Sequence, residues 1–328
     1  MALPTATAPP TRPTPPARAS QPIRPSRDAR IARLARLDGA VSPYLYIAPF
    51  FVVFAAFGLY PMLRTAWMSL HDWDLVGEHR FVGLDNYTGL LSDGYFWNAV
   101  GNTFGIFLLT TVPQLFLALV LASLLNRTRL RARTFFRMAI FVPNVTSVAA
   151  VAIVFGMLFQ RDFGLVNWLL QLAGVSEPID WDAQRWSSWI AIAAMVNWRW
   201  TGYNTLILLA GMQSIPRDLY EAAALDGAGP WRQLWRITLP MLMPTFVFVV
   251  TLSTIGGMQL FTEPLVFGNG VIIGGDQREF QTVAMYMYEK GIVDLGSAGY
   301  GAAVAWALFL MIALVSVGNI LLLRRRVR

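Results

Sequence analysis

The chain has 328 residues, of which 55% are hydrophobic and only 14% are charged. A soluble domain of this size carries about a quarter charged residues, so the composition excludes an ordinary soluble protein; the lack of cysteine also excludes disulfides, thiolate metal sites and cysteine nucleophiles. The net charge of +7 would suit nucleic-acid binding, but the basic residues cluster beside long apolar runs, which is typical of a membrane protein with cytoplasmic positive charge.

The N-terminal segment, residues 1–40, is predicted to be a disordered, basic cytoplasmic tail. Residues 1–27 are rich in Pro, Thr, Ala and Arg and cannot bury a core. No apolar stretch with a cleavage site follows, so we expect no removed leader. Residues 30–37 alternate arginines with apolar residues, which favours equally a short helix on an anionic membrane surface and a basic tail that only orients the first span.

Residues 41–328 are predicted to form one all-α integral membrane domain. Six apolar segments are each long enough to cross about 30 Å of hydrocarbon at about 1.5 Å per residue. The polar segment after the first of them holds both histidines, His71 and His79, which we interpret as ordinary loop residues because a zinc site needs more ligands nearby. The predicted spans are residues 44–70, 97–125, 138–159, 186–212, 241–267 and 300–323.

The basic residues predict that both chain ends are cytoplasmic. The N-terminal tail, segments 126–137 and 213–240 and the C-terminus together hold 19 of the 26 Lys and Arg residues. The three alternate loops hold five of them and most of the acidic residues. By the positive-inside rule the first group of segments is cytoplasmic, and an even number of spans agrees with this N-in/C-in topology.

The predicted cytoplasmic loop 213–240 is the most informative stretch. Ser214 can cap a first short helix that has a proline in its first turn, Gly227 permits a backbone reversal, and Pro230 can start a second helix. Pro240 is expected to end that second helix before the fifth span. A short exposed helix of small residues suits a groove in another protein. Periodicity alone equally favours the alternative, a loop that only caps the helix bundle.

The same loop resembles the EAA signature of ABC-importer permeases. The pattern is Glu221-Ala222-Ala223, three residues, Gly227, nine residues, and Ile237-x-Leu239-Pro240, and it agrees at every position. The resemblance implies a segment that docks on an ATPase subunit. The residues that it assigns to ATPase coupling are Glu221, Ala222, Ala223, Asp226, Gly227, Ile237, Leu239 and Pro240.

From about residue 42 onward the chain resembles the MalF-type sugar permeases. The motifs that carry the likeness are Tyr60-Pro61, Phe81-Val82-Gly83-Leu84-Asp85-Asn86-Tyr87, Phe96-Trp97-Asn98, Asn102-Thr103, Phe141-Val142-Pro143, Gly164-x-x-Asn167 and Leu209-Ala210-Gly211-Met212-Gln213-Ser214-Ile215-Pro216. Two departures are the lack of a large external domain and the lack of a proline after Gly274-Gly275.

That resemblance implies a six-helix type I permease fold of the MalF/MetI-like kind in the bacterial cytoplasmic membrane. It also implies a heterodimer with a second permease subunit, two ATPase subunits, and an extracytoplasmic sugar-binding protein that delivers a di- or oligosaccharide. Membrane lipid surrounds such a subunit, and no nucleic acid is involved.

The chain is interpreted as a non-catalytic subunit. A nucleotide-binding loop ends in Gly-Lys-Ser/Thr, and Lys290, the only lysine, lies outside such a context. Both histidines fall in one loop, which makes a Ser/His/Asp set implausible. We therefore expect no cofactor or metal on this chain, and ATP with Mg²⁺ in the partner ATPase.

Polar residues inside the predicted spans are candidate substrate ligands, because burying them in a membrane is costly. Sugar hydroxyls suit amide, carboxylate and guanidinium groups, while sugar C–H faces suit aromatic rings. The alternative for each residue is a hydrogen bond to a neighbouring helix. The candidates are Asn144, Trp198, Arg199, Tyr203, Asn204, Gln259 and Glu263.

Two further features of these spans carry expectations. Arg199 most needs a partner, and Glu263 is a candidate for a salt bridge with it. Gly256-Gly257 and Pro264 mark either a kink or a close helix approach.

Two other functions compete with a sugar importer subunit. An ABC permease for a non-sugar solute would carry the same Glu221 motif. A stand-alone secondary transporter or channel is a further alternative, although such proteins often show internal repeats or buried acids. The sequence shows no clear repeat, and Glu263 is the one acid inside a predicted span.

Overall fold

The computed structural model describes residues 27–74, 79–126, 132–294 and 297–325, with the backbone alone for 27–40 and 324–325. The chain divides into two units, residues 1–61 and 62–328. Of the predicted tail, residues 1–26 lie outside the described residues and residues 27–40 are described by backbone only, so the tail stays a prediction.

The described residues 27–68 form three consecutive helical elements, the middle one a π-helical turn. Helix α1 spans Arg27–Phe54, the π-helix η1 spans Ala55–Leu59, and α2 (Tyr60–Met68) follows directly. The Tyr60 N–H bonds to the Ala55 carbonyl, five residues back. This widened turn comes just before Pro61, whose ring would otherwise crowd an α-helical carbonyl and break the hydrogen-bond ladder. The helix therefore continues through the proline.

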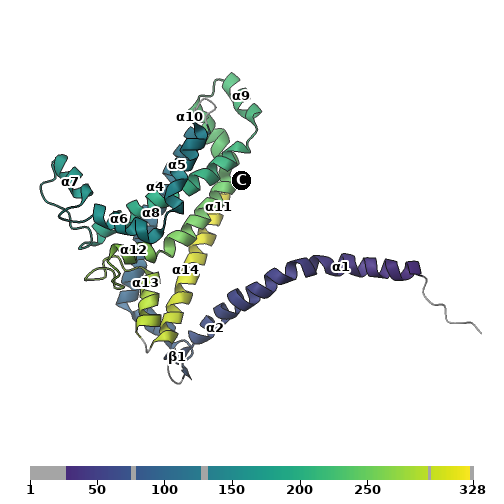
Figure 1. Cartoon of the computed structure of the whole chain (residues 1–328), viewed down its shortest axis with the longest axis horizontal. Helices are drawn as coiled ribbons and strands as arrows, with labels where there is room; N and C mark the ends of the chain where they lie inside the picture. The colour runs from purple at the N-terminus through teal and green to yellow at the C-terminus, as the bar shows by residue number, and fades with distance from the viewer. Residues whose placement is uncertain (1–26, 75–78, 127–131, 295–296, 326–328) are drawn as a thin grey trace, which may run out of the picture. The chain divides into compact units, whose positions relative to one another are not determined.

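Four long helices form the body of the second unit (Figure 1). They are α4 (Gly94–Leu125), α8 (Arg185–Gln213), α11 (Leu239–Met258) and α14 (Ala298–Arg325). Helix α4 packs along α8, and α11 contacts α4, α8 and α14. At Gly202 of α8 an added Cβ would lie 1.6 Å from the Ile140 carbonyl oxygen, so only glycine lets α5 (Arg133–Val145) approach α8 this closely.

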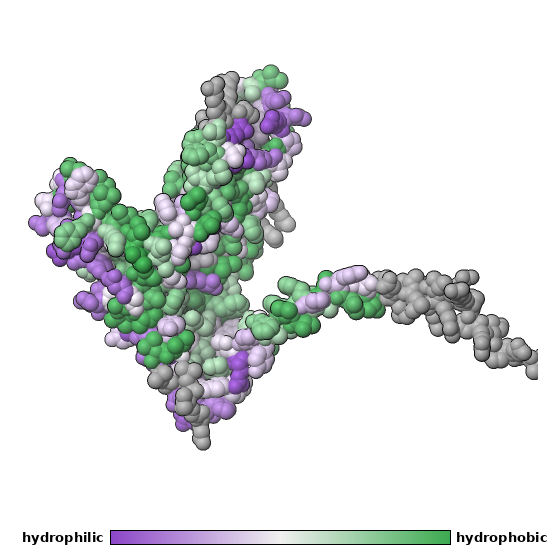
Figure 2. Space-filling model, in the orientation of Figure 1, coloured by the Kyte–Doolittle hydropathy of each residue, from purple (hydrophilic) through white to green (hydrophobic). Residues whose placement is uncertain are grey.

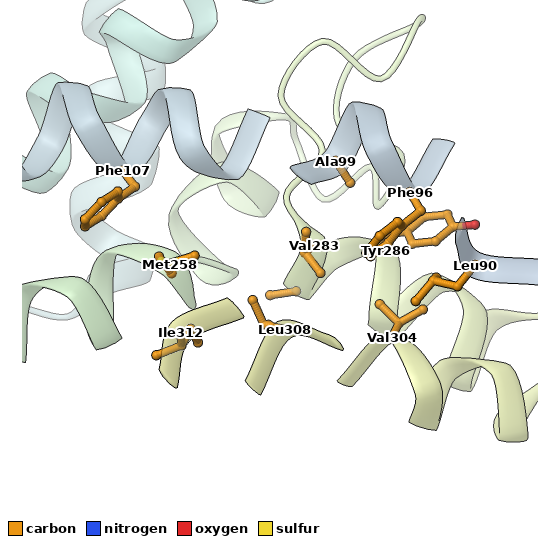
Figure 3. Packing of buried hydrophobic residues seen from close by; sticks show 11 residues of the cluster. Leu90, Phe96, Ala99, Phe107, Met258, Val283, Tyr286, Val304, Leu308 and Ile312 are labelled. Atoms are coloured by element: carbon orange, nitrogen blue, oxygen red, sulfur yellow. The ribbon is translucent and has the colours of Figure 1, made fainter. Parts of the chain in front are cut away.

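One apolar cluster joins α4, α11 and α14 to shorter helices. Phe96, Phe107, Met258 and Tyr286 are among its buried members (Figure 3). The cluster also holds Leu90 of α3 (Asp85–Ser92) and Val283 of α13 (Val283–Tyr288). Lipid tails are as apolar as these side chains, so close van der Waals packing rather than transfer from water holds the short helices to the long ones.

The segment predicted as the third span, 138–159, is a bent pair of helices. Helices α5 and α6 (Val148–Leu158) meet at an angle of 92°. Thr146 and Ser147 between them adopt extended backbone angles, which ends the α-helical ladder. Helix α5 then packs on α8 whereas α6 packs on α12 (Thr262–Phe267), so the two halves follow different partners.

The predicted fifth span, 241–267, has different bounds. Helix α10 (Pro230–Gln233), the π-helix η2 (Leu234–Thr238) and α11 run on as one helix, so the expectation that Pro240 ends a helix is wrong. The Leu239 N–H bonds to the Leu234 carbonyl, and this π-helical turn again precedes a proline. Helix α11 ends at Met258, ψ changes to 15° at Gln259, and α12 is a separate helix.

Four helices among the described residues are long and apolar enough to cross a membrane. They are Val41–Met68, Gly94–Leu125, Pro230–Met258 and Ala298–Leu323, and the bent pair α5–α6 would be a fifth. Helix α8 covers the predicted span 186–212 but contains Asn197, Arg199 and Asn204 and falls outside that set. The count of six spans and the cytoplasmic position of both ends therefore stay predictions.

The remaining elements are short. Strands β1 (His71–Trp73) and β2 (His79–Phe81) form an antiparallel pair with His71 opposite Phe81. Helix α7 (Leu165–Leu172) follows α6, and the π-helix η3 (Glu289–Val293) follows α13.

Candidate functional site

The loop between α8 and α11 contains α9 (Arg217–Leu225), which differs from the prediction at its start. Pro216 is the residue before the helix, and the Ser214 hydroxyl donates to the Gly211 carbonyl at 2.8 Å. Ser214 thus belongs to the end of α8, and the expectation that it caps the loop helix is wrong. Pro230 begins α10, as predicted.

Gly227 makes the reversal after α9. Its φ is +76°, and the Ala228 N–H bonds to the Ala223 carbonyl at 2.8 Å. A positive φ is unfavourable for residues with a Cβ, which explains the glycine at this position of the motif and confirms the predicted turn.

Side-chain contacts hold this loop against the start of the following helix. The Tyr220 and Thr238 hydroxyls are hydrogen bonded at 2.9 Å. The Gln233 amide donates to the Ala228 carbonyl at 2.9 Å. Gln233 and Thr238 lie at positions that the motif leaves free, and their role was missed because only the folded loop brings them to Tyr220 and Ala228.

The predicted coupling residues separate into an exposed tip and a packed base. Glu221, Ala222, Asp226 and Gly227 are exposed, whereas Ala223, Ile237 and Leu239 are half-buried and Pro240 is exposed on the following helix. Leu225 beside the tip is 91% exposed. Figure 2 shows hydrophilic residues gathered at this end of the second unit, with hydrophobic residues along the helices next to it.

A second group of polar residues lies between α4, α8 and α11. The Asn204 amide donates to Gln114 Oε1 at 3.0 Å and to Ser253 Oγ at 3.1 Å, and Asn204 is only 2% exposed. One side chain of α8 thus joins both neighbouring helices. Gln114 was missed, although a glutamine within a largely apolar segment is a signal that the sequence offers.

These residues border a cavity of about 220 Å³. Trp200 and Tyr203 give it an aromatic wall, with ring centroids 5.7 Å apart and planes near perpendicular. Among the described residues no hydrogen bond engages the Tyr203 hydroxyl, Asn204 Oδ1 or the Gln114 amide nitrogen, so a bound molecule would find both donors and acceptors. The lining is Thr110, Thr111, Gln114, Val196, Trp200, Tyr203, Asn204, Leu252, Ser253, Ile255, Gly256, Gly257 and Leu260.

The predicted salt bridge between Arg199 and Glu263 is present. Arg199 Nη1 lies 3.1 Å from Glu263 Oε1, with the side chains 16% and 9% exposed. The pair connects α8 with α12, beyond the break after α11. The Arg199 guanidinium carbon also lies 5.7 Å from the Trp200 ring, so the ion pair stands beside the aromatic wall of the cavity.

The other predicted substrate ligands do not meet at one site. Gln259 borders a different cavity of about 370 Å³, together with Phe261 and Tyr288. Trp198 is 47% exposed and contacts Phe155 at a centroid distance of 5.7 Å. Asn144 is a half-buried residue of α5. Tyr203 and Asn204 are the two candidates that line the cavity of about 220 Å³.

Both a close helix approach and a break in the helix, the two alternatives predicted for Gly256-Gly257, have support in the structure. Gly257 gives close packing, because an added Cβ would lie 3.0 Å from the Phe107 ring. The helix also ends at the next residue, Met258, with Gln259 as its C-cap. The Glu263 and Pro264 side chains lie in α12 beyond this break.

An ion-pair network holds the segment between α12 and α14. Arg278 binds both carboxylate oxygens of Glu289 at 2.6 and 2.8 Å, and the Gln281 amide donates to the same carboxylate. Burial opposes ionisation of Glu289, but the hydrogen bonds from Arg278 and Gln281 outweigh it and hold the pKa of the carboxyl below its usual value. Asn102 of α4 donates to the Arg278 carbonyl at 2.8 Å, so the network is fixed to the bundle.

Asp93 anchors the start of α4 in a similar way. Its Oδ1 accepts the Tyr95 N–H at 2.9 Å, and its Oδ2 accepts the hydroxyls of Tyr286 and Tyr300. Burial again opposes ionisation, yet these hydrogen bonds lower the pKa of Asp93. The Asp93 contacts could not be predicted from sequence, because Tyr286 and Tyr300 lie about 200 positions away in the chain.

Comparison with known proteins identifies relatives that match most of the chain. A family described as "Binding-protein-dependent transport system inner membrane component" matches residues 114–328. The lactose transport system permease protein LacF of Rhizobium radiobacter is 36% identical over 276 residues, which cover 84% of this chain and 92% of that protein. The arabinooligosaccharides transport system permease protein AraP of Bacillus subtilis is 36% identical over 276 residues, or 84% of this chain and 86% of AraP.

A solved structure supports the same fold. A chain of a bacterial ABC transporter involved in the import of the acidic polysaccharide alginate superimposes with a TM-score of 0.73, over 91% of this chain and 100% of that one, at 20% identity.

Proposed function

The chain belongs to the family of binding-protein-dependent transport system inner membrane components, and we propose that it is the permease subunit through which an ABC importer moves a carbohydrate across the bacterial cytoplasmic membrane. The structural observation that supports a carbohydrate as the solute is the cavity between α4, α8 and α11. Amide, hydroxyl and indole groups line it, and these suit the hydroxyls and the C–H faces of a sugar. The relatives that transport lactose and arabinooligosaccharides support the same class of solute.

The full importer would contain a second permease subunit, two ATPase subunits and an extracytoplasmic sugar-binding protein. The family description, which names binding-protein-dependent transport, supports the last of these. Nucleotide and Mg²⁺ would bind in the ATPase subunits, and this chain would carry out no chemical step.

The α9 loop is proposed to couple ATP hydrolysis to transport. Its tip exposes Glu221, Asp226 and Gly227, while the Tyr220–Thr238 and Gln233–Ala228 hydrogen bonds fix it to the helix that becomes α11. A force applied by the ATPase at Glu221 would therefore reach α11 as a rigid-body movement rather than being absorbed by loop motion. Helix α11 supplies Ser253, Gly256 and Gly257 to the cavity wall, so such a movement would change the cavity.

Reconstitution tests this function. The complete importer is placed in proteoliposomes with ATP inside, and uptake of radiolabelled lactose and arabinooligosaccharides is measured from outside in the presence of the binding protein. We expect ATP-dependent uptake of a carbohydrate, lost in Asn204→Leu, with Thr88→Val, an exposed residue of α3, as the control. Uptake without ATP would indicate a secondary transporter, and uptake of amino acids or phosphate alone would indicate another solute class.

A further inference from the structure

The bundle around the cavity carries two opposite charges. Over residues 94–125, 186–213 and 239–267 the sequence has no Asp, Glu, Lys or Arg except Arg199 and Glu263. Neither residue is part of the cavity lining, but the Arg199 guanidinium carbon lies 5.7 Å from the ring of the lining residue Trp200. Among these segments, the charge near the cavity therefore depends on the balance between Arg199 and Glu263.

The structure places the two charges in direct contact. The distance of 3.1 Å and the low exposure of both side chains show that each neutralises the other away from water. The remaining polar groups of the lining are amides, hydroxyls and an indole, all uncharged. Arg199 Nε is buried without a hydrogen-bond partner among the described residues, so the guanidinium already depends on Glu263 for compensation.

A neutral cavity distinguishes between sugars by charge. An uncharged sugar exchanges its hydrogen bonds with water for those of amides and hydroxyls. A uronic acid or a sugar phosphate must also remove an ionised group from water, and that is costly where no countercharge is available. Arg199 cannot act as the countercharge while Glu263 occupies it.

We propose that this cavity admits uncharged carbohydrates and rejects acidic ones, and that Glu263 is the specificity-determining residue because it cancels the charge of Arg199. This inference rests on the proposed carbohydrate function. It separates the chain from an importer of acidic polysaccharide such as the one whose structure shares its fold, because a shared fold at low identity leaves the charge of the site open.

Matched sugar pairs test the charge preference on the unmodified protein. The purified importer complex without its binding protein is titrated with glucose against glucuronate, and with galactose against galacturonate, at equal ionic strength. Binding is read from the rise of the melting temperature with ligand concentration. We expect the sugar concentration that gives half of the maximal rise to be at least about tenfold lower for the neutral member of one or both pairs. Equal or tighter binding of the uronates would overturn the proposal.

Two variants test the role of Glu263. In Glu263→Gln the charge of Arg199 is left uncompensated, and we expect the neutral-to-acidic preference to fall at least tenfold or to reverse. The double variant Arg199→Gln/Glu263→Gln removes both charges and should keep the wild-type preference. An unchanged preference in Glu263→Gln would contradict the assignment of this residue.

The Glu263→Gln variant can also be tested if it is too unstable to purify without a ligand. Recovery of this variant by glucuronate but not by glucose would show the freed charge binding an acid, as proposed. Recovery by neither sugar, with the double variant intact, would reject the role of Glu263. If no sugar of either kind stabilises the wild-type complex and none is taken up into proteoliposomes, the carbohydrate function itself is wrong. Equal binding of neutral and acidic sugars would instead overturn only the charge preference.

Discussion

The α9 loop and the polar cavity differ in how their residues are brought together. The loop residues from Glu221 to Pro240 are neighbours in sequence, and local hydrogen bonds shape them. The cavity instead takes Gln114 from α4, Asn204 from α8 and Ser253 from α11, up to 139 positions apart in the chain. A contiguous, exposed segment can be identified from a pattern of residues, whereas a buried site depends on how helices pack.

The two regions also fail differently when changed. A substitution at the loop tip alters an exposed surface, so it should affect transport and leave folding intact. A substitution at the cavity removes a partner from a buried hydrogen bond or ion pair, so it should affect both.

The largest effect is expected at the loop. Glu221→Lys reverses a charge at the exposed tip, and Gly227→Pro cannot adopt the φ of +76°. We expect both variants to lose ATP-driven uptake in proteoliposomes while inserting into the membrane normally. Asp218→Lys, an exposed position in the first turn of α9, is the matched control. Normal uptake by both variants would remove the coupling role and the contrast between the regions.

The ion pair of the second region should give the largest loss of stability. Arg199→Met or Glu263→Leu alone leaves a buried charge without its partner, which costs about 3–5 kcal/mol of unfolding free energy. The double variant Arg199→Met/Glu263→Leu should recover most of that loss. Thermal unfolding of the purified complex measures all three. Equal stability of the single and double variants would show that the two charges do not depend on each other.

The hydrogen bonds of Asn204 should matter less. Asn204→Leu leaves Gln114 Oε1 and Ser253 without their donor, which costs about 1–3 kcal/mol. Thr201→Val is the control, because the Thr201 hydroxyl bonds within its own helix and its loss should cost about 1 kcal/mol or less. Comparing the melting temperatures of the two variants separates a bond between helices from one within a helix.

A pH series tests the Arg278–Glu289 network, which belongs to neither region. The folded carboxyl has a lowered pKa, so its stabilisation is full above the unfolded value of about 4.3 and is lost as the pH falls through the lower folded value. Glu289→Gln should therefore be less stable than wild type at pH 7, and the difference in melting temperature should shrink below about pH 4. A difference that stays constant with pH would mean that Glu289 is not ionised in the fold.

The smallest effect is expected for Ser214→Ala. The Ser214 hydroxyl bonds to the exposed end of α8 rather than to α9, so the change should alter unfolding free energy by less than about 0.5 kcal/mol and leave uptake unchanged. A loss of about 1 kcal/mol, as for a helix cap, would restore the sequence prediction that the structure corrected.

Particular residues show where prediction from sequence succeeded. Gly227 and Pro230 were placed correctly because backbone restrictions are local. The same local reasoning was wrong at Pro240, because η2 lets the helix continue through the proline. It did not foresee the 92° bend within residues 138–159, which follows from the separate packing partners of α5 and α6.

The sequence by itself determined that this is a helical membrane protein, that Glu221–Pro240 carries an importer motif, and that Arg199 requires a buried partner. Composition, local backbone preference and the cost of unpaired charge act on every fold that the chain could adopt. Only the tertiary structure decided that Asn204 joins Gln114 to Ser253, that Glu263 is the partner of Arg199, and that Gln259 faces another cavity. Those relations depend on the packing of helices distant in the chain, and residue periodicity contains no information about which helix faces which.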